Sequence, residues 1–263
     1  MSSPLVLTET RDKILTLTLH DPATRNAFSL EMAQQLLRAV RKADKDPNIR
    51  CIILTGTDPA FSSGGNIKQM AAIKMGKRGR FFLKISEIIY AIVKIFRQTH
   101  KIVIAAINGP VSGIAFGLVL STDIRFASTP ATFHAGTTLL GLAPNGSATY
   151  FLPRLVGMTR AIEILLTGRK IPAKEAQAIG LIHQAFPHEK LLNETLSFAQ
   201  KMAQGAPLAQ TKIKELLLNS WNQNLKKQLE GERRAIAWTS ETRDFDEGIS
   251  AFLDKRPPCF RGF

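Results

Sequence analysis

Cysteine is scarce in this chain of 263 residues, which carries only Cys51 and Cys259. Two cysteines cannot form the framework that staples small secreted domains, and unpaired thiols fit a reducing compartment. Histidine is also sparse, because its five residues are scattered at spacings that match no metal-binding motif. We therefore predict a cytoplasmic protein without a disulfide framework and without a metal site.

Long apolar runs are missing as well. No stretch of about 18 uncharged apolar residues occurs, so the sequence predicts no membrane span. The first 13 residues lack the basic start and apolar centre of a signal peptide, and they contain Glu9 and Asp12, which a transit peptide avoids. Hydrophobic residues make up 44% of the chain and charged residues 21%, a composition that predicts a folded globular protein.

Acidic residues are too few to balance the basic ones, and the net charge is +14. Such an excess attracts nucleic acid, an anionic membrane surface or a phosphate-bearing ligand. The densest basic cluster comprises Lys68, Lys74, Lys77, Arg78, Arg80 and Lys84. Its only aromatic residues, Phe81 and Phe82, fit a buried helix face better than a stacking platform for bases. We expect a solvated basic surface and do not expect nucleic acid as a partner.

Two glycine-rich junctions are the most informative feature that is present. Residues 60–67 read Ala-Phe-Ser-Ser-Gly-Gly-Asn-Ile after the apolar run 51–54, and residues 108–117 read Asn-Gly-Pro-Val-Ser-Gly-Ile-Ala-Phe-Gly after the run 102–107. A strand that turns through glycines into a helix presents free backbone N–H groups. Two such donors converging on one carbonyl oxygen would form an oxyanion hole. Taken alone, the glycines are explained more simply as residues that permit tight turns.

Strands and helices alternate in the N-terminal part of the chain. We expect strands at residues 5–8, 14–19, 51–54, 102–107 and 123–127, and helices beginning at a Ser29 cap and spanning 80–97 and 113–121. Beyond residue 157 the pattern is mainly helical, with helices expected at 197–204, 208–219 and about 225–252. The order predicts an α/β fold, with a core over residues 1–190 and a helical region over 191–263 that packs on the core or on a neighbouring subunit.

Together the motifs resemble the crotonase superfamily, the enoyl-CoA hydratase/isomerase family. The resemblance covers nearly the whole chain and depends on several segments that occur in the family's order. These segments are Asp-Pro at 21–22 with Arg-Asn-Ala at 25–27, both glycine junctions, residues 118–128, Leu-Pro-Arg-Leu-Val-Gly at 152–157, Leu-Thr-Gly-Arg at 166–169, Glu-Ala at 175–176 with Gly-Leu at 180–181, and residues 252–258.

The resemblance implies a crotonase-like spiral of ββα units with a C-terminal helical region, assembled as a homotrimer or a hexamer. It also implies an acyl-coenzyme A thioester as substrate and no tightly bound cofactor. Carried over by position, the oxyanion-hole donors are the backbone N–H groups of Gly65 and Ile114. The residues implied to bind substrate or coenzyme A are Arg25, Ala27, Ala60, Ser62, Ser63, Gly64, Asn66, Ile67, Lys68, Gly113, Phe116 and Gly117.

The chain departs from the family pattern at its acids. Hydratases of the family use two glutamates, and some isomerases and dehalogenases use a carboxylate further on. At the three positions that correspond to these acids, the resemblance implies Gly117, Thr137 and Asn145, none of which titrates near neutral pH. Adding water to a double bond needs a base for the water and an acid for the α-carbon, so two-glutamate hydration is not expected. Thr137 and Asn145 are expected to orient the substrate by hydrogen bonds.

Other titratable groups could be recruited to the site. His134 follows Phe133 on a predicted strand and should point away from it, and an outward or hydrogen-bonded role is favoured over a catalytic one. Glu87, Asp246 and Glu247 are further acids, each explained more simply as a surface charge.

Three functions stay open. The preferred one is an acyl-CoA enzyme of the lyase or isomerase class, acting as an isomerase, a decarboxylase or a thioester hydrolase. The second is an acyl-CoA-binding pseudoenzyme that has lost its acids. The third is an RNA-binding protein built on the crotonase fold.

Overall fold

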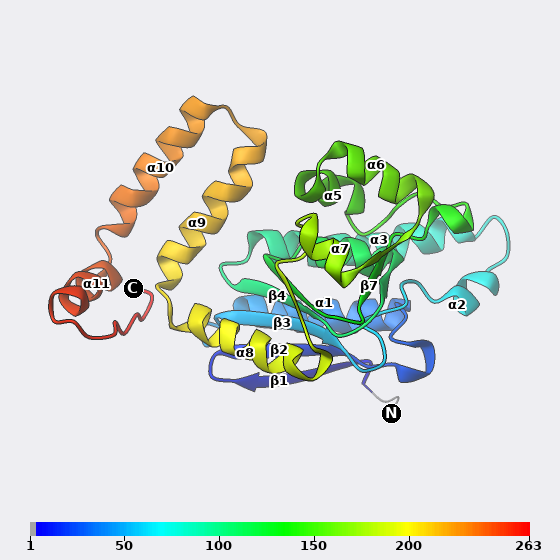
Figure 1. The fold of residues 1–263 in the computed structure, drawn as a ribbon, viewed down its shortest axis with the longest axis horizontal. Coiled ribbons are helices and arrows are strands. Elements are labelled where there is room, and N and C mark those ends of the chain that lie inside the picture. The colour runs from blue at the N-terminus through cyan, green and yellow to red at the C-terminus, as the bar shows by residue number, and fades with distance from the viewer. Residues whose placement is uncertain (1–3) are drawn as a thin grey trace.

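A six-stranded sheet runs through the computed structural model, which describes residues 4–263 (Figure 1). Its order is β1-β2-β3-β4-β6-β9, in which β1 and β2 form an antiparallel hairpin and the remaining neighbours are parallel. The strands are β1 (Val6–Arg11), β2 (Ile14–Leu19), β3 (Cys51–Gly56), β4 (Ile102–Ile107), β6 (Ile124–Ser128) and β9 (Gln184–Phe186). Parallel neighbours require crossover connections, which explains the helices between successive strands and confirms the predicted α/β fold.

A second, three-stranded sheet joins β5 (Val111–Ser112), β7 (Thr132–His134) and β8 (Lys170–Pro172). Strand β7 lies in the middle, parallel to β5 and antiparallel to β8. Strand β5 follows β4 of the large sheet and leads directly into α4 (Gly113–Leu120). The second glycine junction is therefore the place where the chain passes from one sheet to the other.

Apolar side chains cover both faces of the large sheet. Successive residues of a strand face opposite sides. In β3, Ile52 and Leu54 join the core formed with α1 (Leu30–Lys45) and α3 (Arg78–Gln98), whereas Cys51 and Ile53 join the core formed with α8 (His188–Gln204). Burial on both faces is typical of parallel strands and explains the uninterrupted apolar runs in the sequence.

Helix α1 begins at the predicted cap. The Ser29 hydroxyl accepts a hydrogen bond from the Met32 N–H at 3.1 Å, which satisfies one of the free donors of the first turn. The remaining helices of the core are α2 (Ile67–Ala71), α5 (Ala148–Val156), α6 (Met158–Thr167), α7 (Ala173–Ala178), and the short 3-10 helices η1 (Pro22–Thr24) and η2 (Thr138–Leu140).

The C-terminal helices differ from the predicted bounds. Helix α8 starts nine residues before the expected residue 197, because Leu191 and Thr195 are buried against the sheet together with later residues of the helix. The expected helix over 225–252 is two helices, since the Thr242 side chain accepts from the Phe245 N–H and starts a new one. The helices are α9 (Pro207–Asn219), η3 (Ser220–Asn222), α10 (Leu225–Thr239) and α11 (Arg243–Leu253).

Helices α10 and α11 lie at the end of the molecule opposite to α2 (Figure 1). Helix α10 has no buried residue. Within residues 4–263, no helix combines the length and the apolar character that crossing a bilayer requires. The same residues hold no group of three or more His, Cys, Asp or Glu side chains that could bind a metal ion.

The two thiols should differ sharply in reactivity. Burial raises the pKa of the Cys51 thiol to about 12, whereas Cys259 is exposed. Because the thiolate is the reactive form, we expect an aromatic disulfide reagent to label one thiol quickly in the native protein and a second only after denaturation. Cys259→Ser should remove the fast reaction, and fast labelling that persists in this variant would contradict the buried position of β3.

Candidate active site

The two glycine junctions run side by side. Ser62 joins them, because its N–H donates to the Pro110 carbonyl at 3.2 Å and its carbonyl accepts from the Ser112 N–H at 3.0 Å. Gly64 follows at a φ of +93°, and a Cβ there would lie 2.8 Å from the Ser112 carbonyl oxygen. Glycine alone permits both this conformation and this approach of two backbones.

The turn before α1 packs against the first junction. The Asn26 side chain is fully buried and donates to carbonyls of the loop that follows β3. The Phe28 N–H donates to the Gly64 carbonyl at 2.6 Å, and the Phe28 carbonyl accepts from the Asn66 N–H at 3.2 Å. Phe28 and Gly65 thus form a parallel bridge, in which Phe28 hydrogen-bonds with the residues directly before and after Gly65. The N–H of Gly65 itself is therefore directed away from Phe28.

The amides of Gly65 and Ile114 border the same cavity, which has a volume of about 550 Å³. Ile114 is the second residue of α4, and the first turn of a helix leaves its N–H groups without partners inside the helix. Within residues 4–263, neither of these two amides donates a hydrogen bond. The sequence-predicted donors are thus brought together at one cavity with their hydrogen-bonding capacity unused.

The cavity is largely apolar. Ile114 of α4 contributes to its apolar lining. Helices α2 and α3 and the segment after β7 supply the rest, which consists of Ile67, Met70, Phe82, Ile85, Ala135, Leu139, Leu140, Leu142, Ala143 and Pro144. Polar side chains in the lining are Ser63, Ser86, Tyr90, Ser112, His134, Thr137 and Asn145. Among the described residues that border it there is no Asp, Glu, Lys or Arg. Acid–base chemistry by these lining residues would use another kind of side chain.

Over residues 9–262 the chain matches the family described as enoyl-CoA hydratase/isomerase. The chain belongs to this family. It is 33% identical over 257 residues to 2,3-dehydroadipyl-CoA hydratase of Escherichia coli strain K12, covering 96% of each chain. It is 30% identical to 1,2-epoxyphenylacetyl-CoA isomerase of the same strain, covering 98% of each chain.

Solved structures agree with this membership. A crystal structure of an enoyl-CoA hydratase from Polaromonas sp. JS666 matches with a TM-score of 0.93 at 30% identity, covering 97% of this chain and 99% of that one. An enoyl-CoA hydratase from Bacillus anthracis also matches with a TM-score of 0.93, at 29% identity, covering 99% of this chain and 100% of that one. The predicted crotonase fold is confirmed, and the chain is an enzyme of the hydratase or isomerase kind.

Two of the three predicted acid positions of this crotonase border the cavity. The Thr137 hydroxyl oxygen is buried and has no hydrogen-bond partner among the described residues. The Asn145 Nδ2 donates to the Ser86 hydroxyl at 2.9 Å, and its Oδ1 accepts from the Gly146 N–H. Where the family resemblance places carboxylates, this cavity therefore has one unpartnered hydroxyl and one amide already hydrogen-bonded to the protein.

The third acid position, Gly117, does not border the cavity. Helix α4 is buried from Ile114 onward, and a Cβ on Gly117 would lie 2.5 Å from the carbonyl oxygens of both Asn145 and Gly146. Phe116 is likewise fully buried in the core. These two residues, predicted to contact substrate, lie away from the cavity because α4 turns them toward the core and toward the loop at Gly146.

His134 borders the cavity on β7. Its neighbour Phe133 is fully buried, so the predicted alternation is confirmed, and the face opposite Phe133 is the cavity. Within residues 4–263 the imidazole has no hydrogen-bond partner. The outward or hydrogen-bonded role favoured from the sequence therefore gives way to an unpartnered ring at the cavity surface.

The other predicted binding residues fall into three groups. Those that border the cavity are Ser63, Ile67 and Gly113. Those that present an exposed cation are Arg25 and Lys68. Those that build the junction or its turn, without bordering the cavity, are Ala27, Ala60, Ser62, Gly64 and Asn66. In the last group Asn66 caps α2, because its Oδ1 accepts from the Gln69 N–H at 3.0 Å.

Sequence reasoning missed the contribution of α3. Phe82, Ser86 and Tyr90 recur at four-residue spacing and share one helix face, which borders the cavity. Beside that face runs the core stripe that includes Ile85 and Ile89. Polar residues at helical spacing next to such a stripe are the signal that could have identified this wall.

None of the alternative acids reaches the cavity. Glu87 on α3 and Asp246 on α11 are exposed and do not border it. Glu247 is paired with Arg256 at 2.7 Å, and hydrogen bonding by that guanidinium lowers the pKa of Glu247 to about 2. Glu247 is therefore an ionised partner within the C-terminal segment.

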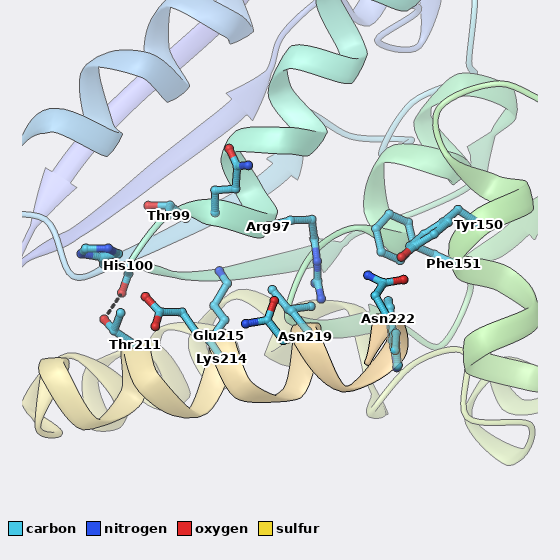
Figure 2. A pocket seen from close by; sticks show the side chains of 13 residues that line it. Arg97, Thr99, His100, Tyr150, Phe151, Thr211, Lys214, Glu215, Asn219 and Asn222 are labelled. Atoms are coloured by element: carbon cyan, nitrogen blue, oxygen red, sulfur yellow. Dashed lines mark hydrogen bonds between the residues drawn. The ribbon is translucent and has the colours of Figure 1, made fainter. Parts of the chain in front are cut away.

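A second cavity, of about 400 Å³, lies between the end of α3 and α9 (Figure 2). Asp123 accepts from Lys214 at 2.7 Å and from Arg97 at 3.4 Å, so these cations are already paired. The Arg97 guanidinium also lies over the Phe151 ring, 5.2 Å from its centroid. None of the residues assigned above to catalysis or to substrate binding borders this cavity, and its contacts join the core to the C-terminal helices.

Introducing a carboxylate should destabilise the fold to different degrees at two of the acid positions. Gly117→Glu should lower the free energy of unfolding by about 3 kcal/mol, because its Cβ overlaps two carbonyl oxygens. Thr137→Glu can extend into the cavity and should cost less than about 1.5 kcal/mol. Urea unfolding followed by circular dichroism measures both, and Gly117→Ala isolates the effect of the Cβ. A Gly117→Ala variant as stable as the native chain would contradict the packing of α4 on Gly146.

Proposed function

We propose that this enzyme binds an acyl-CoA thioester with its carbonyl oxygen between the N–H groups of Gly65 and Ile114, and stabilises the thioester enolate there. The observation that carries the proposal is that both amides are unpartnered and border one cavity. Negative charge that develops on the thioester oxygen would be held by donors already in place, which is the most effective form of electrostatic catalysis.

The proposed chemistry is enolate formation without two-carboxylate hydration. Gly117, Thr137 and Asn145 cannot take and give a proton near neutral pH, and no carboxylate is found among the described lining residues. A double-bond shift or a decarboxylation needs the oxyanion hole and at most one proton carrier. Thr137 and Asn145 are assigned to orienting the acyl group, and the apolar lining excludes water from the enolate.

Coenzyme A is assigned to the turn and the first junction. Arg25 in the turn and Lys68 in α2 are exposed cations, Ser63 of the first junction borders the cavity, and phosphates require such cations. The Ser63 N–H donates to the Arg25 carbonyl at 2.9 Å, so the turn and the junction form one surface. The named relatives act on CoA esters, in agreement with this assignment. The free thiols Cys51 and Cys259 fit a cytoplasmic location.

The oxyanion hole can be tested by removing one N–H group. Ile114→Pro deletes a donor in the first turn of α4, a position where helices tolerate proline. Turnover of an acyl-CoA substrate should fall by about 10²–10³-fold. Ile114→Ala keeps the N–H and should stay within a few-fold of the native rate. Equal rates for the proline variant and the alanine variant, with both folded by circular dichroism, would refute the assigned donor.

The reaction class can be tested with a panel of enoyl-, malonyl- and β-hydroxyacyl-CoA thioesters, with products followed by mass spectrometry. We expect isomerised or decarboxylated products and no appreciable hydration. Rapid hydration would contradict the proposal. Tight calorimetric binding without any product would identify an acyl-CoA-binding pseudoenzyme, a second candidate favoured by the lack of carboxylates in the lining.

We also propose that the helical region over residues 191–263 assembles the chain into a homotrimer or into a hexamer made of two trimers. Helix α10 buries none of its residues, yet Leu229 and Ile236 stand seven positions apart on one face and are 54% and 71% exposed. An apolar helix face of this kind requires a partner surface.

The assembly can be tested by charging that face. The double variant Leu229→Glu with Ile236→Glu should shift the mass in light scattering from a multiple of three chains to one chain, because carboxylates oppose burial of the face. Lys226→Glu, an exposed position on the same helix, should leave the assembly intact. A native chain that is already monomeric at micromolar concentration would refute the proposal.

A further inference from the structure

The proposed enolate chemistry needs a group that removes the proton from the α-carbon. Of the described residues that border the cavity, only His134 and Tyr90 carry a titratable side chain. A phenol holds its proton near neutral pH, whereas an imidazole both accepts and donates one there. The choice of side-chain chemistry therefore favours His134.

The placement of His134 favours it as well. In the small sheet His134 pairs with Ser112, which directly precedes Gly113 and lies two residues before Ile114. Adjacent strands are about 4.8 Å apart, and directly paired residues project to the same face of a sheet. The His134 side chain thus projects from the strand next to the one that leads into the oxyanion-hole amide of Ile114, and both residues border the same cavity.

The ring of His134 is held in position without using its nitrogens. A Cβ on Gly136 would lie 2.8, 2.9 and 3.2 Å from three ring atoms, so the imidazole packs directly over the Gly136 backbone. Among residues 4–263 no group hydrogen-bonds either ring nitrogen. The facing charged residue on the neighbouring strand, Lys170, is exposed and does not border the cavity. Both nitrogens of the half-buried ring are free for a ligand.

We infer that His134 is the residue that takes up and returns the substrate proton in this cavity, an inference that rests on the proposed acyl-CoA function. With a 3-enoyl-CoA substrate, the α-carbon–hydrogen bond breaks and its proton passes to the neutral imidazole. The electron pair moves onto the thioester oxygen, held by the Gly65 and Ile114 amides. The imidazolium, whose N–H exchanges with solvent, then delivers a proton to the γ-carbon as the dienolate collapses, and the product is the 2-enoyl-CoA. Atoms and charge balance without another reactant.

The test uses a six-carbon 3-enoyl-CoA in deuterated buffer, with isomerisation and deuterium uptake at the α-carbon followed by mass spectrometry. His134→Gln should lower both rates by at least about 100-fold, the usual contribution of a general base. Calorimetric affinity for the thioester should change by less than about three-fold, because the glutamine keeps a polar side chain of similar size.

His100→Gln is the matched control. His100 is exposed and borders the separate cavity between α3 and α9 (Figure 2), so the same substitution there should leave activity unchanged. His134→Ala should regain activity as free imidazole is added, a response that a purely structural role would not produce.

Different failures point to different conclusions. Absence of thioester binding by the native chain would overturn the proposed function itself, and the inference with it. Binding by the native chain without isomerisation or deuterium uptake would overturn the enolate chemistry, and the role of His134 with it. A His134→Gln variant that keeps activity within a few-fold would overturn the role of His134 alone. Imidazole that fails to rescue a folded, thioester-binding His134→Ala variant would overturn it too.

Discussion

The contact on which the rest of the site depends is the close approach of two backbones at the glycine junctions. Ser62 hydrogen-bonds the second junction on both sides, and Gly64 passes within a distance of Ser112 that no side chain could share. Each junction follows a strand of the same parallel sheet, so both end at the same sheet edge. This contact brings the amides of Gly65 and Ile114, nearly fifty residues apart in sequence, to one cavity.

The cavity around those amides combines few polar groups with an apolar enclosure. In such surroundings a hydrogen bond to a charged oxygen is stronger than in water, because no solvent competes for it. The same surroundings penalise a carboxylate, and the described lining holds none. An unpartnered imidazole at His134 and an unpartnered hydroxyl at Thr137 are what the cavity offers instead. This polar set suits the movement of a single proton better than the addition of water.

Much of the fold could be predicted because its signals are local. The apolar runs at β3 and β4, the Ser29 cap and the break between the helices expected at 197–204 and 208–219 each specify a structure within a few residues. Two predicted helix bounds were wrong, one because of a distant contact and one because a local cap was overlooked. Helix α8 extends back to His188 because its first turns pack on the sheet. The expected helix through residue 252 ends at Thr239, and a hydroxyl at Thr242 starts the next one.

The sequence by itself determined the family, the ligand class and the absence of acids at positions 117, 137 and 145, because motif order and residue identity can be read without coordinates. Only the tertiary structure decided which groups occupy the space that acids at those positions would fill. Carbonyls of the loop at Gly146 fill the place beside Gly117, and the strand that carries His134 places it at the cavity that Ile114 also borders. Such outcomes depend on contacts between segments that lie far apart in the chain, and no local pattern encodes them.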